Sequence, residues 1–224
     1  MARGFCVLSM IFIHFLYDLT DIYRHFPEFP RFLQPVKEYG GIAFFLISGV
    51  CATLSRRPFR RGLTVLACAA LVRLVTTLAG MPVRFGVLGC LGCAMVLWPL
   101  FRPFPGAALL FCALSCILAG AAFRHLPVTV PFLYPLGLCV PGFTSADYFP
   151  LFPFLGYFLL GAVLGRFLYP ARRSLCPRFS FESPPARLLR FCGRHALPLY
   201  LLHQPVLLVF LETLYFLGEK LYES

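Results

Sequence analysis

The sequence is poor in charged residues and especially poor in acids. Only 13% of its 224 residues are charged, and the whole chain has nine Asp and Glu, whereas charged residues make up about a quarter of an ordinary soluble domain. The hydrophobic share is 59%, which is more apolar surface than one soluble core of this size could bury. The composition therefore excludes an ordinary soluble fold and indicates a protein surrounded by lipid.

The chain also lacks the patterns that would give its cysteines or its basic residues a special role. Ten cysteines are present, most of them inside apolar runs, and the one CxxC motif, Cys90 and Cys93, has no second pair or nearby histidine to complete a zinc site. We therefore expect no metal and interpret the cysteines as small packing residues. The net charge of +11 comes from basic residues between apolar runs, which indicates membrane topology and attraction to anionic lipid rather than nucleic acid.

A cleavable signal sequence is not evident at the N-terminus. The first apolar stretch has one basic residue, Arg3, contains His14, and reaches Asp18 without a small-x-small cleavage site. We interpret it as a retained first helix.

The apolar runs predict an all-α, polytopic bundle of about seven spans, because a helix needs about 20 mostly apolar residues to cross a bilayer. The predicted spans are residues 4–20, 39–55, 62–80, 84–101, 106–123, 150–168 and 196–216. Four prolines in 126–148 favour a packed or re-entrant loop there over a straight span. With no convincing internal repeat, we expect one membrane-embedded domain over 1–224, with an extracytoplasmic loop at 124–149 and a cytoplasmic loop at 169–195.

Lys and Arg are distributed unequally between the connections, which predicts the orientation. If the N-terminus lies in the cytoplasm, the inner segments hold thirteen Lys and Arg and the outer segments six. The opposite orientation would place the basic clusters outside. We therefore predict a cytoplasmic N-terminus and a multi-pass protein of the plasma (inner) membrane.

Two polar residues in the first span are candidates for catalysis, since ionisable groups inside a bilayer are costly. His14 lies ten residues into this span, roughly 15 Å deep, and Asp18 follows at i+4 on the same helix face. A carboxylate at this spacing can orient an imidazole and raise its basicity. The structural alternative is a helix end at which Asp18 reaches the outer water.

Arg73 and His203 lie at comparable predicted depths in two other spans. A guanidinium keeps its proton and must pair or face water, so Arg73 either binds substrate or forms a structural ion pair, with Asp18 as a candidate partner. His203 precedes Pro205, which frees a backbone carbonyl, and is either a second catalytic base or part of a bond between helices. Convergence of three such side chains is what a buried reaction centre would require.

The predicted outer loops hold three more candidates. His25 is either a catalytic base or a solvated loop histidine. Asp147 and Tyr148 precede the sixth span, where a carboxylate would be favoured at the helix start; alternatively, the two residues form the mouth of a substrate cavity.

Four segments together resemble one known family over nearly the whole chain. They are Arg3-Gly4 with Met10–Asp18, Phe44–Gly49 followed by an arginine cluster, Asp147–Pro153, and Tyr200–Pro205. These segments resemble the catalytic-domain family of heparan-α-glucosaminide N-acetyltransferase, in a bacterial form related to the wider membrane acyltransferases. Where bacterial relatives often have Phe-Gly-Ile-Leu-His in the fourth span, this chain has Gly89 in place of the histidine.

The resemblance implies transfer of an acetyl group from cytosolic acetyl-CoA to an amine or hydroxyl of an extracytoplasmic glycan. His14, oriented by Asp18, would then act as general base or carry the acetyl group, with His203 or the loop residue His25 as other candidates. Arg73, Asp147 and Tyr148 would bind the acceptor. The CoA phosphates would meet cytoplasmic arginines, namely Arg56, Arg57, Arg60 and Arg61.

Two other classes of function fit the same residues. A small-molecule transporter would use the buried polar side chains to line a path, and a structural membrane protein would have lost catalysis. The expected partners are membrane lipid and the glycan acceptor, with no nucleic acid, and a second copy of the chain, in a homo-oligomer, is a further candidate.

Overall fold

The computed structural model describes residues 1–22, 29–170 and 182–222, and almost all of its regular structure is helical. Among these residues there is no strand, although an isolated bridge joins Phe85 and Tyr148. This result confirms the all-α prediction. The chain forms two compact units, which are described separately: unit 1 contains residues 1–40 and 180–224, and unit 2 contains residues 41–179.

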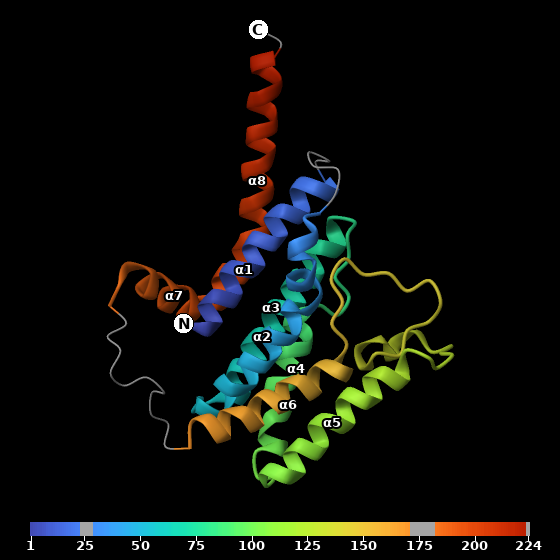
Figure 1. The fold of residues 1–224 in the computed structure, drawn as a ribbon. Helices are drawn as coiled ribbons and strands as arrows, with labels where there is room; N and C mark the ends of the chain where they lie inside the picture. The colour runs from blue at the N-terminus through green and yellow to red at the C-terminus, as the bar shows by residue number, and fades with distance from the viewer. Residues whose placement is uncertain (23–28, 171–181, 223–224) are drawn as a thin grey trace. The chain divides into compact units, whose positions relative to one another are not determined.

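Unit 1 is built from both ends of the chain. Its helices are α1 (Ala2–Tyr17), which continues into the π-helical turn η1 (Asp18–Ile22), the short η2 (Arg31–Leu33), α7 (Pro184–Arg194) and α8 (Ala196–Tyr222). Helix α1 packs against both α7 and α8 (Figure 1). Helix α2 (Gln34–Leu54) begins in this unit and continues into unit 2.

Unit 2 contains the rest of α2 and four further long helices: α3 (Pro58–Leu78), α4 (Val87–Phe101), α5 (Gly106–Phe123) and α6 (Leu151–Leu168). Between α5 and α6 the chain is irregular apart from the 3-10 helix η3 (Pro131–Leu136), so this proline-rich stretch forms no straight helix, as the sequence predicted. Helix α5 packs against α6, and α3 packs against α4 (Figure 1).

Glycines bring the backbones of α2 and α6 into direct contact. A Cβ at Gly49 would overlap the carbonyl oxygen of Phe158, and one at Gly161 would overlap the carbonyl oxygen of Leu46. On the α5 side, a Cβ at Gly156 would lie 2.6 Å from the Ala113 carbonyl oxygen. In lipid, helices associate through such close packing of small residues. Helix α6 is therefore the centre of unit 2.

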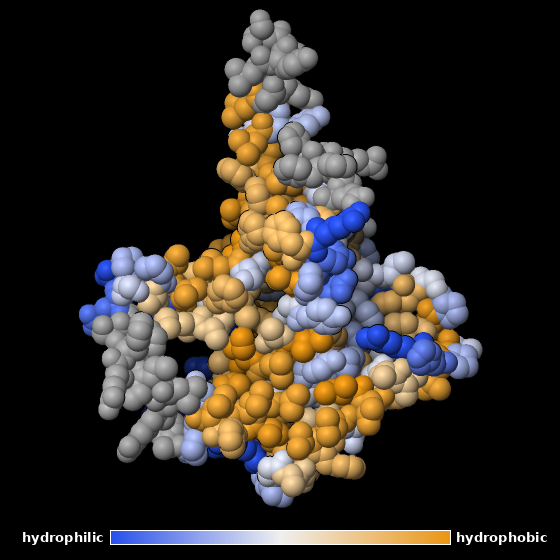
Figure 2. All heavy atoms as spheres, in the orientation of Figure 1, coloured by the Kyte–Doolittle hydropathy of each residue, from blue (hydrophilic) through white to orange (hydrophobic). Residues whose placement is uncertain are grey.

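The outer surface of the protein is strongly apolar. Leu78 and Phe167 are each 81% exposed, and Figure 2 shows apolar side chains over much of the visible surface. In the part of the chain that the structure describes, five helices are long and apolar enough to cross a membrane: Ala2–Thr20, Pro58–Leu78, Gly106–Phe123, Leu151–Leu168 and Ala196–Leu217. The protein is therefore a helical membrane protein.

Two of the seven predicted spans correspond to helices that do not meet these criteria. The run 39–55 falls in α2, which begins with polar residues such as Gln34, and the run 84–101 falls in α4, which is only 15 residues long. Helix α4 starts at Val87 because the preceding residues pair with the chain near Tyr148, where Phe149 N donates to the Phe85 carbonyl oxygen at 2.9 Å.

Helix α7 lies within residues 169–195, for which the sequence predicts only a loop. The signal was present, because Pro184 and Pro185 occupy the first helical positions after Ser183, where proline is favoured. The arginines that follow were interpreted only as topology signals.

Candidate functional site: a histidine pair and an arginine pocket

Two histidines from opposite ends of the chain meet inside unit 1. The rings of His14 on α1 and His203 on α8 have centroids 4.9 Å apart and an interplanar angle of 80°. Both residues are catalytic candidates from their sequence context, which does not show whether their helices are neighbours. The structure brings them into contact.

Backbone carbonyls fix the orientation and the proton position of both rings. His14 Nδ1 lies 2.9 Å from the Met10 carbonyl oxygen, and His203 Nδ1 lies 2.5 Å from the Tyr200 carbonyl oxygen. A carbonyl oxygen only accepts hydrogen bonds, so each Nδ1 carries a proton and donates it. In each neutral imidazole, Nε2 then holds the free lone pair, which is the form needed in a base or nucleophile.

The Nε2 atom of His203 is buried and has no hydrogen-bond partner among the described residues. An unpaired polar atom is costly away from water, and such groups call for an explanation in terms of function or an unseen ligand. In the neutral ring this nitrogen carries a lone pair, so it is an acceptor for a donor that the described residues do not supply.

A buried carboxylate lies one turn beyond His14. Asp18 is 0% exposed, and Gln204 Nε2 donates to its two oxygens at 2.9 and 3.0 Å. In the structure the Met10 carbonyl oxygen is the partner of His14 Nδ1, and the amide of Gln204 is the donor to Asp18. The orientation of His14 by Asp18 and the pairing of Asp18 with Arg73 stay predictions. The role of Asp18 in catalysis stays a prediction.

Gln204 is the residue of this cluster that the sequence analysis missed. It is adjacent to His203, and its Oε1 atom is buried with no partner in the described part of the chain. The available signal was an amide side chain in an otherwise apolar helix, since any polar group in such a helix needs a reason.

The register of α1 against α8 explains why these four side chains meet. Gly4 packs against the backbone of α7 at Leu189 and Gly193. Further along, His14 meets His203 and Asp18 meets Gln204. Residues that come later on α1 contact residues that come later on α7 and α8, so α1 and α8 run in the same direction. Helix α7 contacts the start of α1 at Gly4 and leads into α8 through His195, so it positions the beginnings of both helices.

The predicted acceptor residues lie in unit 2. Arg73 is an exposed residue of α3, and its Nη1 donates to the hydroxyl of Tyr134 at 3.2 Å. The hydroxyl of Tyr148 donates to the Tyr134 carbonyl oxygen at 2.7 Å and accepts from the Cys139 thiol. Burial raises the pKa of Tyr148 because it disfavours the phenolate. Arg73 and Tyr148 thus belong to one cluster around Tyr134.

Asp147 has a structural task in this unit. Its Oδ2 accepts from the backbone N–H of Val87 at 3.0 Å, at the N-terminus of α4, where a carboxylate is favoured. The sequence analysis considered this kind of role for the helix that follows Asp147, but the structure assigns it to α4. The close approach also needs Gly86, where a Cβ would overlap the carboxylate.

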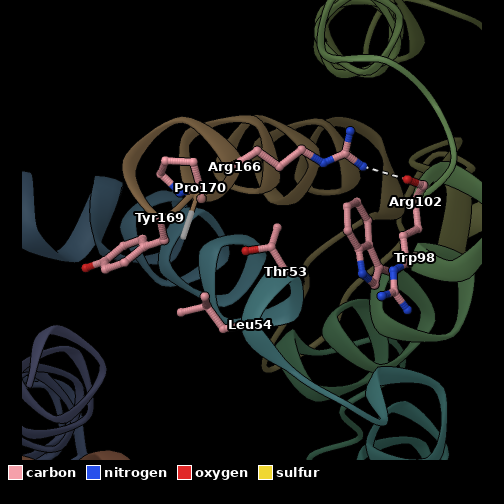
Figure 3. Close-up of a pocket in the computed structure, with 8 residues that line it drawn as sticks. Thr53, Leu54, Trp98, Arg102, Arg166, Tyr169 and Pro170 are labelled. Atoms are coloured by element: carbon pink, nitrogen blue, oxygen red, sulfur yellow. Dashed lines mark hydrogen bonds between the residues drawn. The ribbon is translucent and has the colours of Figure 1, made fainter. Parts of the chain in front are cut away.

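The four predicted donor-binding arginines follow α2. Arg56 and Arg57 lie in the α2–α3 connection, and Arg60 and Arg61 lie in the first turn of α3; all four are exposed. Just before them, Thr53 and Leu54 line a pocket of about 340 Å³ (Figure 3). The ends of α4 and α6 complete this pocket with Trp98, Arg102, Gly165, Arg166, Tyr169 and Pro170.

The two arginines of the pocket differ in their bonding. Arg166 donates to the carbonyl oxygens of Phe104 at 2.6 Å and Arg102 at 2.7 Å, and its guanidinium lies 5.5 Å from the Trp98 ring centroid. It therefore stabilises the C-terminal end of α4. Arg102 is exposed, and its guanidinium lies beside Trp98 in Figure 3, so its positive charge is accessible to an anion in the pocket.

The remaining candidate, His25, lies outside the described residues. Within the described parts of the chain, no group of three or more His, Cys, Asp or Glu side chains could hold a metal ion.

Comparison with known proteins identifies the family. The family model described as heparan-alpha-glucosaminide N-acetyltransferase, catalytic, matches residues 1–205, a range that contains all of the site residues discussed above. No curated protein and no solved structure matches the chain. The protein is a member of the heparan-α-glucosaminide N-acetyltransferase catalytic-domain family, a family of membrane acetyltransferases.

Proposed function

We propose that this protein moves an acetyl group from cytosolic acetyl-CoA to an amine or hydroxyl of an extracytoplasmic glycan. The observation that carries the proposal is the His14–His203 pair, in which both Nδ1 atoms are bonded to carbonyl oxygens, so that the lone pair of each neutral ring lies on Nε2. Family membership supplies the acetyl-transfer chemistry. The identity of donor and acceptor is part of the proposal.

The chemistry that this pair supports is acyl transfer with general base catalysis. The acceptor nitrogen or oxygen attacks the thioester carbonyl carbon as an imidazole Nε2 removes its proton. A carbon–nitrogen or carbon–oxygen bond forms, the carbon–sulfur bond breaks, and the CoA thiolate leaves and takes up the proton. His14 is the proposed base, with His203 as the second candidate.

A covalent route uses the same atoms. An Nε2 lone pair attacks the thioester carbonyl carbon, the carbon–sulfur bond breaks, and CoA leaves as the thiolate. The acetyl group stays on the imidazole as a cationic acetylimidazolium until the acceptor displaces it, and the proton that the acceptor loses passes through the neighbouring imidazole to the thiolate. The contact between the two rings gives the acetyl-bearing histidine a neighbouring base for that second step.

The donor is proposed to bind at the cytoplasmic ends of the helices of unit 2. The phosphates of CoA require cations, and arginine binds phosphate through paired N–H donors. Arg56, Arg57, Arg60 and Arg61 are exposed at the α2–α3 connection, and the pocket that begins at Thr53 adds the accessible guanidinium of Arg102.

The proposed topology places these arginines on the donor side. It has seven spans, formed by the five candidate spans together with α2 and α4, a cytoplasmic N-terminus, and one membrane-embedded domain in the plasma membrane. The excess of Lys and Arg in the inner segments supports this orientation. The cluster of Arg73, Tyr134 and Tyr148 then belongs to the outer, acceptor side, where Arg73 and Tyr148 are proposed to bind the glycan.

The experiment is acetyl transfer by the full chain in lipid nanodiscs, from radiolabelled acetyl-CoA to amino-sugar acceptors. We expect His14→Gln and His203→Gln each to lower the rate by a factor of about 100 or more, because general base catalysis commonly contributes that much. The matched control is His125→Gln, which makes the same change at an exposed histidine after α5 and should retain the wild-type rate.

Two results would contradict the proposal at different points. Full transfer by both His14→Gln and His203→Gln would remove the histidine pair from the reaction. Failure of the wild-type protein to bind a non-hydrolysable acetyl-CoA analogue, measured by calorimetry in nanodiscs, would remove the donor and favour the transporter or structural alternatives.

A further inference from the structure

Helix α7 has three distinct faces. On a helix with 100° per residue, Ala186, Leu189, Cys192 and Gly193 share one face, and this face packs against α1: Ala186 and Cys192 are buried, and Leu189 and Gly193 contact Gly4. Burial of this face accounts for the packing of α7 within unit 1. The other two faces remain to be explained.

The second face of α7 is an uncovered apolar strip. Leu188 is 53% exposed and Phe191 is 55% exposed, and the exposed residue Pro184 lies in line with them at i, i+4 and i+7. Phe191 touches the ring of His195, with centroids 4.5 Å apart, but much of its surface stays open. Two large apolar side chains side by side on a short polar helix indicate a partner that is itself apolar.

The third face of α7 is a row of arginines. Arg187, Arg190 and Arg194 are all exposed and fall within about 60° of one another around the helix axis. The charge is not balanced nearby in the sequence, since residues 166–194 contain seven arginines and a single acid, Glu182. The partner of this face is therefore anionic.

We propose that α7 lies along the membrane–water interface and binds an anionic lipid leaflet. Leu188 and Phe191 enter the boundary between headgroups and acyl chains, while Arg187, Arg190 and Arg194 contact lipid phosphates. An apolar strip flanked by arginines is the pattern of helices that lie in the interfacial plane, and each basic residue near an anionic surface adds attraction. A soluble protein partner would fit the arginines but would leave no reason for the neighbouring bilayer-like strip.

This placement has a consequence for the histidine pair. Helix α8 starts at Ala196, directly after α7, so an interfacial α7 fixes the level at which α8 enters the membrane. His203 is seven residues further on, which puts it roughly 10 Å below that level. Because Gly4 of α1 is packed on the same helix, α7 sets the depth of both histidines.

The first test uses tryptophan fluorescence, because Trp98 is the single tryptophan of the chain. In a Trp98→Phe background, Leu188→Trp places one reporter on the apolar strip. The protein is studied in nanodiscs whose acyl chains carry bromine close to the headgroup or close to the chain end. Leu114→Trp is the control for deep lipid contact, since Leu114 is 48% exposed in the middle of α5.

We expect shallow bromine to quench Leu188→Trp at least roughly two-fold more strongly than deep bromine, with the reverse order for Leu114→Trp. Acrylamide should quench the Leu188→Trp emission weakly. Strong quenching by acrylamide with no effect of bromine would place the strip in water and overturn the proposal. Quenching by neither agent would mean that protein covers the strip, which overturns it as well.

The second test concerns the charge of the lipid. Brominated phosphatidylglycerol or brominated phosphatidylcholine is added at the same low fraction to a zwitterionic host. The anionic lipid should quench Leu188→Trp roughly two- to five-fold more effectively. Combined Arg187→Gln, Arg190→Gln and Arg194→Gln should abolish that preference and leave the shallow depth unchanged. Equal quenching by the two lipids in the parent protein would contradict anionic recognition. Neither test depends on acetyl transfer.

Discussion

The two compact units hold their helices together by different means. In unit 2, glycines at positions 49, 156 and 161 let backbones touch, and the contacts are apolar. In unit 1, α1 and α8 meet through two imidazoles and an amide–carboxylate pair, of which Asp18 is completely buried. Close packing stabilises helices in lipid at little cost, whereas buried polar groups are expensive. The buried polar groups of unit 1 are therefore the costlier of the two kinds of helix contact, and this cost supports the proposal that the reaction takes place there.

The largest loss of stability is expected when an added methyl group separates the backbones of α2 and α6. Gly161→Ala would force its Cβ into the carbonyl oxygen of Leu46, and we expect a loss of about 3 kcal/mol in the free energy of unfolding, since a backbone cannot give way as a side chain can. The measurement is unfolding in mixed micelles with increasing SDS.

Gly106→Ala is the matched control, because no atom lies within 4 Å of a Cβ at that position. It should unfold at the wild-type SDS fraction or slightly above it. If both variants unfold with the same midpoint, the close contact between α2 and α6 does not contribute to the stability of unit 2.

The next effect concerns the polar pair of unit 1. Gln204→Leu removes the donor to Asp18 and leaves a buried carboxylate without it, which should cost about 2 kcal/mol. Replacing both Asp18 and Gln204 by Leu removes the buried carboxylate together with its donor, so the double variant should recover much of the lost stability. The measurement is a double-mutant cycle on the free energy of unfolding. Strict additivity of the two changes would mean that the pair is not coupled.

A smaller effect is expected at the end of α4. Arg166→Lys keeps the charge, but an ammonium lacks the planar fork that reaches the carbonyl oxygens of Arg102 and Phe104 and lies beside Trp98. We expect a loss of about 1 kcal/mol in unfolding free energy, with a red shift of Trp98 emission as its surroundings loosen. Arg102→Lys, at an exposed arginine of the same pocket, should leave both quantities unchanged. Equal effects of the two substitutions would refute the different roles assigned to these arginines.

The smallest effect is a dependence on alkaline pH in unit 2. Burial raises the pKa of Tyr148, so the phenol stays neutral in the folded protein while the unfolded chain ionises near pH 10. The resulting stability is fully present below about pH 10 and declines above it.

Tyr148→Phe should therefore flatten the decline in unfolding midpoint between about pH 9.5 and 11, at a cost of about 1 kcal/mol at neutral pH for the lost bond to Tyr134. Tyr39→Phe, at a tyrosine that is 61% exposed, should leave the alkaline slope as it is. A wild-type slope in Tyr148→Phe would show that other groups control it.

Much of this architecture was predictable, because apolar periodicity and length determine where helices form in lipid. The run 106–123 coincides with α5, and 150–168 differs from α6 by one residue. The boundaries of α4 were less predictable, since its first residues depend on distant partners: Asp147 accepts from Val87 and Phe149 donates to Phe85. Such long-range bonds leave no local pattern.

Some residues of the candidate site could be predicted from the sequence, and others could not. His14 and His203 could be singled out because each is an ionisable group in an apolar run, but their contact needed the packing of α1 on α8. Gln204 was not predicted because a neutral amide within a span is a weaker signal than a charged group, although it is the donor to Asp18. Arg102 was counted only for topology, since a pocket that joins the ends of α2, α4 and α6 cannot be inferred from one sequence.

The separation of Asp18 and Gln204 by 186 positions also matters during biosynthesis. The first helix leaves the ribosome long before the last one, and the whole of residues 41–179 must be inserted in the interval. Throughout that time the aspartate lacks its amide donor. A nascent or truncated chain that ends before the final helix therefore carries an unsatisfied acid in its first membrane segment, which would mark it for chaperones or degradation.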